Sequence, residues 1–386
     1  MRVGVVHDWL DTWRGGEVVL AEILRVYPDA TLFALVDHLD DADRQRLNGR
    51  RVHTSFIDRL PFSRSRFRMY LPLFPAAIAS LDLAGFDLVL SSSHAFAKGV
   101  RVLPSQLHVC YCYTPMRYAW DLQDQYLRQT GLDGGLRGLA ARALLGRLRD
   151  WDRRTSKRVD HFIAISHFIA RRIRTTYGRD ASVIYPPVSV AASSRPEVRR
   201  HVRDDTYVTV SALVPYKRID VLAEAFRLLP DRTLVVIGDG PDRARLLRTA
   251  PANVRFLGRI SDDARDLEVA TARGFVYAAE EDFGIAPLEA QGLGTPVIAF
   301  AHGALAETIR GLDHAQPTGV LFGEQSAGAA AAAIRAFESA PQRIASEACR
   351  ANAARFASGR FRDELRECIA GWYHDFVARD AGEPRR

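Results

Sequence analysis

The chain has 386 residues, of which 47% are hydrophobic and 26% are charged. This length suffices for two domains, and the composition excludes a disordered or fibrous protein. No apolar run reaches the roughly 18 residues of a membrane-spanning helix, and the apolar part of the N-terminus is too short for a signal peptide. The net charge of +7 favours anionic partners, namely nucleic acid, an anionic membrane surface or an anionic substrate.

The four cysteines predict reduced, structural thiols. Cys110 and Cys112 alternate along an expected strand and lack the two-residue gap of a zinc knuckle, and Cys349 and Cys368 fall in helical sequence. Free thiols are typical of a cytoplasmic protein. Peripheral association with the inner face of the plasma membrane is compatible with the basic charge.

Short apolar runs and helical patterns alternate along both halves of the chain. We expect strands at 2–7, 31–36, 86–90, 107–113, 160–166 and 182–185, and then at 207–213, 233–237, 254–259, 274–278, 295–300 and 319–322. This alternation predicts an α/β protein with two doubly wound parallel sheets. A polar, proline-containing stretch at 186–200 marks the domain boundary and a hinge between the domains.

Two features of the first half stand where strands end. The pair Gly15-Gly16 lies between the first strand and a helical pattern, as in a phosphate-binding turn. His94 follows the serine run 91–93 after the third strand, where a doubly wound domain places its chemistry. Glycine pairs are also common in sharp turns, and a lone histidine is usually structural, so neither feature identifies a site alone.

The stretch 56–81 interleaves arginines with aromatic and aliphatic residues. This composition is typical of a membrane interface or of contact with a lipid-linked acceptor. The alternative is a group of helices that pack their apolar residues inward and expose their arginines. We hypothesise that part of this surface contacts anionic lipid.

A strand-to-helix turn in the second half carries the most chemical information. An apolar run ends at residue 278, and Pro287 fits the first turn of the helix that follows. Phe283, Gly284 and Ile285 then form a tight turn whose free N–H groups can bind a phosphate, because a helix N-terminus attracts negative charge.

Two carboxylates flank this turn, Glu281 before it and Glu289 inside the helix. Ionised carboxylates accept hydrogen bonds from hydroxyl groups. One on each side of a phosphate site suggests a diphosphate with a hydroxylated ring at each end, which describes a nucleotide-sugar. The alternative is an ordinary solvated loop with acidic residues.

The segment resembles the retaining glycosyltransferases of family 4, whose hallmark is two glutamates separated by seven residues, with Phe-Gly just after the first. Here these are Glu281, Phe283-Gly284 and Glu289. The resemblance implies a GT-B fold, in which two Rossmann-like domains face each other across a cleft. It also implies that Glu281 contacts the donor sugar and that Glu289 binds the nucleotide ribose.

Two further motifs resemble a bacterial mannosyltransferase subgroup that builds cell-surface polysaccharides such as lipopolysaccharide. They are Thr-Pro-Met-Arg-Tyr at 114–118 and Tyr-Lys-Arg-Ile-Asp at 216–220. The subgroup carries a histidine where this chain has Tyr113, so the role of that histidine is not transferred. This likeness implies GDP-mannose as the donor and a saccharide or lipid-linked saccharide as the acceptor.

The resemblance also implies the roles of individual residues. Catalytic roles fall to Glu281, His94 and Lys217; donor binding falls to Gly15, Gly16, Ser211, Lys217, Arg218, Phe283, Gly284, Ile285, Ala286 and Glu289; acceptor binding falls to Arg117 and Tyr118. The family's first basic residue after the strand is replaced here by Ser211 or Ala212. We expect no metal and no other cofactor, and we interpret the acidic run 41–43 as solvated loop.

We expect an N-terminal acceptor-binding domain over residues 1–188, joined by a C-terminal helix at 365–380, and a donor-binding domain over 200–364. Three alternatives remain open. The first is another donor, such as GDP-rhamnose, a UDP-sugar or a dTDP-sugar. The second is a GT-B sugar-nucleotide epimerase or hydrolase. The third is a nucleic-acid-binding protein, although no recognition module is present and we expect no nucleic-acid partner.

Overall fold

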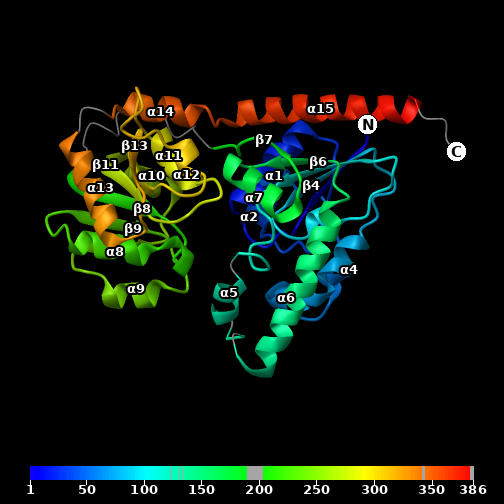
Figure 1. Cartoon of the computed structure of the whole chain (residues 1–386), viewed down its shortest axis with the longest axis horizontal. Helices are drawn as coiled ribbons and strands as arrows, with labels where there is room; N and C mark the ends of the chain where they lie inside the picture. Colours follow the sequence, from blue (N-terminus) through cyan, green and yellow to red (C-terminus); the bar gives the residue numbers. More distant parts are fainter. Residues whose placement is uncertain (122, 130, 133, 189–202, 341–343, 383–386) are drawn as a thin grey trace. The chain divides into compact units, whose positions relative to one another are not determined.

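The computed structural model describes residues 1–121, 123–129, 131–132, 134–188, 203–340 and 344–382 (Figure 1). The chain forms two compact units. Unit 1 comprises Met1–Pro186 and Phe361–Arg386, and unit 2 comprises Pro187–Arg360. Most of the expected hinge at 186–200 and most of the chain end expected to be disordered, at 382–386, lie outside the described residues.

Unit 1 is built on a seven-stranded parallel sheet in the order β3-β2-β1-β4-β5-β6-β7. The strands are β1 (Val3–His7), β2 (Thr31–Ala34), β3 (Val52–Thr54), β4 (Leu88–Ser93), β5 (Leu107–Cys112), β6 (His161–Ala164) and β7 (Ala181–Val183). The chain leaves β1 toward β2 on one side and returns to β4 on the other. The carboxyl ends of β1 and β4 therefore form the switch point where such sheets bind ligands.

Helices cover the sheet of unit 1. They are α1 (Gly15–Val26), α2 (Asp41–Arg46), α3 (Ser63–Arg66), α4 (Phe74–Ala79), α5 (Gln123–Gln129), α6 (Gly135–Ser156), α7 (His167–Tyr177) and α15 (Ser358–Gly382), with the 3-10 helices η1 (Phe56–Arg59), η2 (Phe67–Leu73) and η3 (Ala97–Gly99). The side chain of Ser166 accepts a hydrogen bond from the N–H of Ile169 and so caps α7.

Unit 2 repeats this topology with a six-stranded parallel sheet in the order β10-β9-β8-β11-β12-β13. Its strands are β8 (Arg203–Val210), β9 (Thr233–Ile237), β10 (Val254–Gly258), β11 (Ala272–Tyr277), β12 (Val297–Phe300) and β13 (Gly319–Phe322). Its helices are η6 (Pro215–Lys217), α8 (Ile219–Arg227), α9 (Arg243–Thr249), α10 (Asp262–Thr271), α11 (Ile285–Gly292), α12 (Leu305–Thr308), α13 (Ala327–Ser339) and α14 (Ser346–Ala354). Its switch point lies at the carboxyl ends of β8 and β11.

The last helix, α15, packs against unit 1. The ring of Phe361 lies edge-on to Tyr111 of β5, and Trp372 stacks on His161 of β6 with ring centroids 4.2 Å apart. The Nη1 atom of Arg362 lies 2.8 Å from the carboxylate of the buried residue Glu22 in α1. The end of the chain thus completes the unit that its beginning forms.

The predicted fold class, two parallel doubly wound sheets, is confirmed, but the prediction for the serine run is wrong. The serines 91–93 do not follow a strand but form the end of β4, paired in register with residues 110–112 of β5. Their side chains are buried. Ser91 and Ser92 hydrogen-bond His108 and His7, so the polar run is an internal network rather than a loop.

The stretch 56–81 packs some of its apolar side chains inward and exposes others. Ile57, Phe67 and Phe74 are buried in the core of unit 1, whereas Phe62 and Met69 are exposed. The cysteines predicted to be free are free: Cys110, Cys112 and Cys349 are buried, and Cys368 is half-buried. The acidic run 41–43, predicted to be a solvated loop, instead forms the first turn of α2, although none of the residues of this helix is buried.

Candidate functional site

The polar centre of unit 2 lies at its switch point and is built around Glu281. Lys217 follows β8 and places its Nζ atom 2.5 Å from Oε1 of Glu281. The hydroxyl of Tyr277, the last residue of β11, donates to the same oxygen at 2.7 Å. Nζ of Lys217 also lies 3.3 Å from the Tyr277 hydroxyl oxygen. A lysine, a tyrosine and a carboxylate thus meet where two neighbouring strands end.

Electrostatics keep this lysine charged. Burial alone would lower the pKa of Lys217, but the attraction of Glu281 and Tyr277 and the hydrogen bond to Glu281 raise it well above its usual value. The side chains of Lys217 and Glu281 are 18% and 16% exposed, so both reach the surface. The arrangement supplies a fixed positive charge and a hydrogen-bond acceptor to a ligand.

The backbone of Glu281 is fixed by its neighbours. Its carbonyl accepts the N–H of Ala304 at 2.8 Å, and it forms a β-bridge with Gly303. Gly303 has a φ of 75°, and a Cβ there would lie 2.3 Å from the carbonyl oxygen of Glu281. Only glycine fits this contact.

The predicted strand-to-helix turn is present. Gly284 precedes α11 with a φ of 89°, and a Cβ on it would meet Leu305 at 2.4 Å. Ile285 and Ala286 then open the helix. Their N–H groups lie in its first turn, where a helix leaves its donors without an intrahelical partner. The ring of Phe283 is buried and lies against the ring of Phe356.

Glu289 lies in α11, where its carbonyl accepts the N–H of Leu293 at 3.1 Å. Its carboxylate forms no hydrogen bond with any residue that the structure describes. Burial raises its pKa to about 7, while Arg265 opposes this rise and Asp266 and Asp262 add to it. The side chain is only partly exposed. A carboxylate that accepts no hydrogen bond from the described residues is suited to the hydroxyl donors of a ligand.

Two other predicted donor contacts differ in character. Ser211 follows β8; its N–H donates to the carbonyl of Ile237 at 3.0 Å, and its hydroxyl donates to the carbonyl of its neighbour Ala212 at 3.2 Å. Arg218 has a φ of 53° before α8, and its guanidinium bonds Asp220 and, at 2.6 Å, Gln325. Gln325 in turn donates to the carbonyl of Ala278 at 2.7 Å. Arg218 therefore ties the loops after β8 and β11 together.

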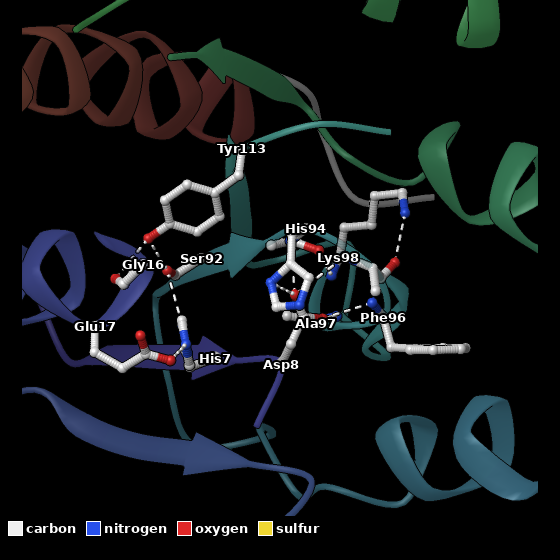
Figure 2. Close-up of polar contacts among 12 residues, drawn as sticks. His7, Asp8, Gly16, Glu17, Ser92, His94, Phe96, Ala97, Lys98 and Tyr113 are labelled. Carbon is white, nitrogen blue, oxygen red and sulfur yellow. Dashed lines mark hydrogen bonds and ion pairs between the residues drawn. The ribbon is translucent and has the colours of Figure 1, made fainter. Parts of the chain in front are cut away.

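The polar centre of unit 1 lies at the ends of β1 and β4 (Figure 2). Asp8 follows β1 and is fully buried, and its Oδ2 atom lies 2.9 Å from Nδ1 of His94. His94 follows β4, and its side chain is 35% exposed. The edge of Trp9 lies against the His94 ring, with centroids 4.6 Å apart.

The glycine pair lies beside this centre, inside a helix rather than in a turn before it. Gly15 and Gly16 are the first two residues of α1. The Tyr113 hydroxyl donates to the carbonyl of Gly16 at 3.0 Å and is hydrogen-bonded to Ser92 at 2.8 Å. Ser92 also bonds His7 at 3.0 Å (Figure 2). Tyr113 thus holds the glycine pair against the sheet.

Glu17 completes this network. Its carboxylate accepts the N–H of Arg14 at 2.8 Å and lies 3.5 Å from Nε2 of His7. Burial would raise the pKa of Glu17, but the hydrogen bond and charge of His7 lower it. The start of α1 is therefore fixed by buried side chains.

The predicted acceptor residues lie in the turn that follows β5. Met116 and Ala119 of this turn are fully buried, whereas Arg117 and Tyr118 are half-buried. The Tyr118 hydroxyl is buried and has no hydrogen-bond partner among the described residues. Burial raises the pKa of Tyr118 well above its usual value.

Asp8, Tyr277 and Gln325 were not predicted from the sequence. The first two had a usable signal, because each stands at the carboxyl end of a buried strand. Gln325 had none, since it reaches the site from a loop near α13. Within the described residues, no three His, Cys, Asp or Glu side chains gather in a way that could hold a metal ion.

Two family models match the chain in succession. "Glycosyltransferase Family 4" matches residues 13–192, and "Glycosyl transferases group 1" matches residues 192–356. The chain belongs to glycosyltransferase family 4. It is 18% identical to the crystal structure of Anabaena Alr3699/HepE in complex with UDP, with a TM-score of 0.68 over 96% of this chain and 100% of that chain. This likeness supports the GT-B fold.

Two curated relatives are mannosyltransferases. A GDP-mannose-dependent monoacylated alpha-(1-6)-phosphatidylinositol monomannoside mannosyltransferase of Corynebacterium glutamicum is 31% identical over 184 residues, which is 41% of this chain and 48% of the relative. The O-antigen chain mannosyltransferase RfbU of Salmonella typhimurium is 27% identical over 153 residues, 37% of this chain and 42% of the relative. The chain thus matches about half the length of these relatives.

Proposed function

We propose that this protein is a retaining glycosyltransferase that moves mannose from GDP-mannose to a saccharide or lipid-linked saccharide in cell-surface polysaccharide synthesis. The observation that carries the proposal is the cluster of Lys217, Tyr277 and Glu281 beside the start of α11. The mannosyltransferase names of the relatives from Corynebacterium and Salmonella support the choice of sugar.

In this proposal the diphosphate of the donor lies at the N-terminus of α11. The N–H groups of residues 284–286 and the charge of Lys217 balance the negative charge that grows on the departing GDP. Glu289 accepts hydrogen bonds from the ribose hydroxyls. Glu281 accepts hydrogen bonds from the sugar, and no metal takes part.

Retention then follows from attack on the face that the diphosphate leaves. The acceptor oxygen forms its bond to the anomeric carbon as the bond from that carbon to the phosphate oxygen breaks. The acceptor proton passes to the departing phosphate. Glu281 orients the sugar in this scheme and forms no bond to it, consistent with a carboxylate engaged by Lys217 and Tyr277.

A donor screen tests the proposal. The full chain is incubated with GDP-mannose, GDP-rhamnose, UDP-glucose and dTDP-rhamnose, each with and without a lipid-linked saccharide acceptor, and products are separated by mass. We expect transfer from GDP-mannose that requires the acceptor. Preferential transfer from a UDP-sugar would contradict GDP-mannose as the donor. Conversion of the donor sugar in the incubation without acceptor would indicate an epimerase or hydrolase.

We further propose that unit 1 rests on an anionic membrane surface, where a lipid-linked acceptor would be found. Exposed apolar side chains occur at Phe62, Met69 and Leu73 beside exposed arginines, and at Leu136 and Leu139 of α6. Among the described helices, none is long and apolar enough to cross a bilayer. Contact would therefore be peripheral, through basic and apolar side chains.

Vesicle sedimentation at low salt tests this contact. We expect binding to vesicles of phosphatidylglycerol but not to those of phosphatidylcholine. The double variant F62S/L136S should bind severalfold more weakly, while L228S, which changes an exposed leucine of unit 2, should bind as the wild type does. Equal sedimentation with both lipids, or with neither, would contradict the proposal.

A further inference from the structure

The turn that carries His94 is held by one carboxylate. Asp8 accepts four successive backbone N–H groups, from His94 at 2.6 Å, Ala95 at 3.0 Å, Phe96 at 2.5 Å and Ala97 at 2.6 Å. The same carboxylate lies 2.9 Å from the ring nitrogen Nδ1 of His94. Figure 2 shows the ring of His94 lying over Asp8. A single buried side chain therefore fixes both the backbone and the imidazole of this residue.

A second buried carboxylate holds the other end of the turn. Nζ of Lys98 donates to the carbonyl of Ala95 at 2.8 Å and pairs with Asp152 of α6. Asp152 also accepts Nε1–H of Trp120 at 2.8 Å and the hydroxyl of Tyr177 at 2.7 Å. The turn is thus anchored at both ends, which leaves the ring of His94 one orientation.

The ring has one nitrogen to offer. Nδ1 faces the carboxylate and must carry a proton to donate to it, which leaves Nε2 as the atom available to a ligand. Within the described residues, Nε2 forms no hydrogen bond. A carboxylate that accepts Nδ1–H fixes the tautomer of a catalytic imidazole and stabilises its charged form in many hydrolases.

We propose that Asp8 is a positioning residue that holds His94 as an imidazolium, with Nε2–H available to a ligand oxygen. The inference rests on the proposed function and extends it, since it names the group that sets the charge of His94. A positive charge at Nε2 would stabilise an anion that develops on such an oxygen.

The charges around His94 favour this form. Burial would lower the pKa of His94, but the charge and hydrogen bond of Asp8, with smaller effects from Glu17 and Asp11, raise it above its usual value. Among the described residues, the titratable or charged groups near the ring or its carboxylate are Asp8, Asp11, Glu17, His7, Tyr113, Tyr118 and Arg68. Arg68 is paired with Asp11 at 2.6 Å, so its charge is balanced.

Histidine-labelled protein tests the inference without any activity measurement. Long-range proton–nitrogen NMR spectra report which ring nitrogen carries the proton, and the peaks of His94 are those missing from the H94Q variant. In the wild type we expect a proton on Nδ1 at every pH, and on both nitrogens at pH 7. If the neutral ring of His94 in the wild type carries its proton on Nε2, that result overturns the proposal without any variant.

Variants then separate positioning from structure. In D8N we expect the midpoint of the His94 titration to fall by at least about one pH unit. D11N is the control, because it removes a carboxylate that does not bond His94. In D11N the proton should stay on Nδ1 of His94. In D8N, kcat should fall about a hundredfold, KM for the donor should change little, and the alkaline limb of the pH profile should move to lower pH. An unchanged His94 titration in folded D8N would overturn the role of Asp8.

The two proposals fail differently. If no donor is consumed by the wild type, the proposed function fails, while the NMR spectra still decide whether Asp8 sets the charge of His94. If transfer occurs but the H94Q and D8N variants turn over normally, the function stands and this inference fails.

Discussion

The two units place polar clusters at the same topological position but hold them in opposite ways. In unit 1 the carboxylate at the end of β1, Asp8, is completely buried and accepts five hydrogen bonds from the protein. In unit 2 the carboxylate after β11, Glu281, is partly exposed and pairs with Lys217. The first cluster is rigid before any ligand arrives, whereas the second must rearrange its own ion pair to receive one.

This difference assigns the two centres different tasks. A carboxylate satisfied by backbone N–H groups has no capacity left for a ligand, so Asp8 can only orient other residues. In place of their mutual ion pair, Glu281 can bind a sugar hydroxyl and Lys217 can bind a phosphate. We therefore expect substitutions at the polar centre of unit 2 to reduce the rate of donor transfer most strongly. Substitutions at the polar centre of unit 1 should act through the orientation of the residues that it holds.

The largest effect should come from Lys217. Replacement by alanine removes the one cation that contacts Glu281 among the described residues, and we expect kcat to fall 10²–10³-fold, about 3–4 kcal/mol of transition-state stabilisation. Steady-state rates with GDP-mannose measure this. The exposed Lys157 provides the control, and K157A should match the wild type. A K217A enzyme with near-normal turnover would contradict the role assigned to unit 2.

The next effect is on the stability of unit 2. In G284A the new methyl group would lie 2.4 Å from Leu305 in a backbone with a φ of 89°, so we expect a loss of roughly 1–3 kcal/mol. Thermal unfolding monitored by circular dichroism measures it. G328A, where a Cβ meets nothing within 4 Å in α13, should instead match or exceed the wild type. Equal melting of both variants would mean that the turn is not constrained.

A pH effect should distinguish Glu289 from the carboxylates of unit 1. Burial raises its pKa to about 7, so the ionised acceptor that ribose needs appears between pH 6 and 8. We expect KM for the donor to fall about tenfold over that range. A KM that does not change with pH would count against the ribose contact. The exposed Glu347 serves as control, and E347Q should keep the wild-type profile.

The same shift predicts a gain in stability for E289Q. Because the folded pKa of Glu289 lies above its usual value of 4.5, the protonated group favours folding below pH 4.5, and this contribution is lost as the pH rises to 7. E289Q avoids this loss and should be more stable than the wild type at pH 8 by about 1–2 kcal/mol. This figure is reduced because the side chain is partly exposed and solvent screens its charge. Melting curves at pH 5 and pH 8 measure this gain, which should vanish at pH 5.

The smallest effects should come from two tyrosines. Y113F removes the hydroxyl that bonds Gly16 and Ser92, and Y277F removes the one that bonds Glu281. Each should cost about 1 kcal/mol. In Y113F we expect the loss mainly in melting temperature, because the cluster is buried, and in Y277F mainly in kcat. The reverse pattern would contradict the distinction between the two centres.

The sequence predicted the elements better than the contacts. The turn at Gly284 could be predicted because a strand run, Pro287 and the later glycines each limit the local backbone. The pairing of Asp8 with His94 could not, because 86 residues separate them and only the strand order brings β1 beside β4. The location of the serines 91–93 could not be predicted either, because polar residues usually mark loops, whereas here Ser91 and Ser92 bond His108 and His7 inside the sheet.

The helix α15 has a consequence for how the protein is made. Its residues from Phe361 onward belong to the unit that the first 186 residues build, so Tyr111, Glu22 and His161 gain their partners only after unit 2 has been synthesised. The N-terminal half leaves the ribosome with part of its surface uncovered. The folding of unit 1 is therefore completed only after α15 has emerged.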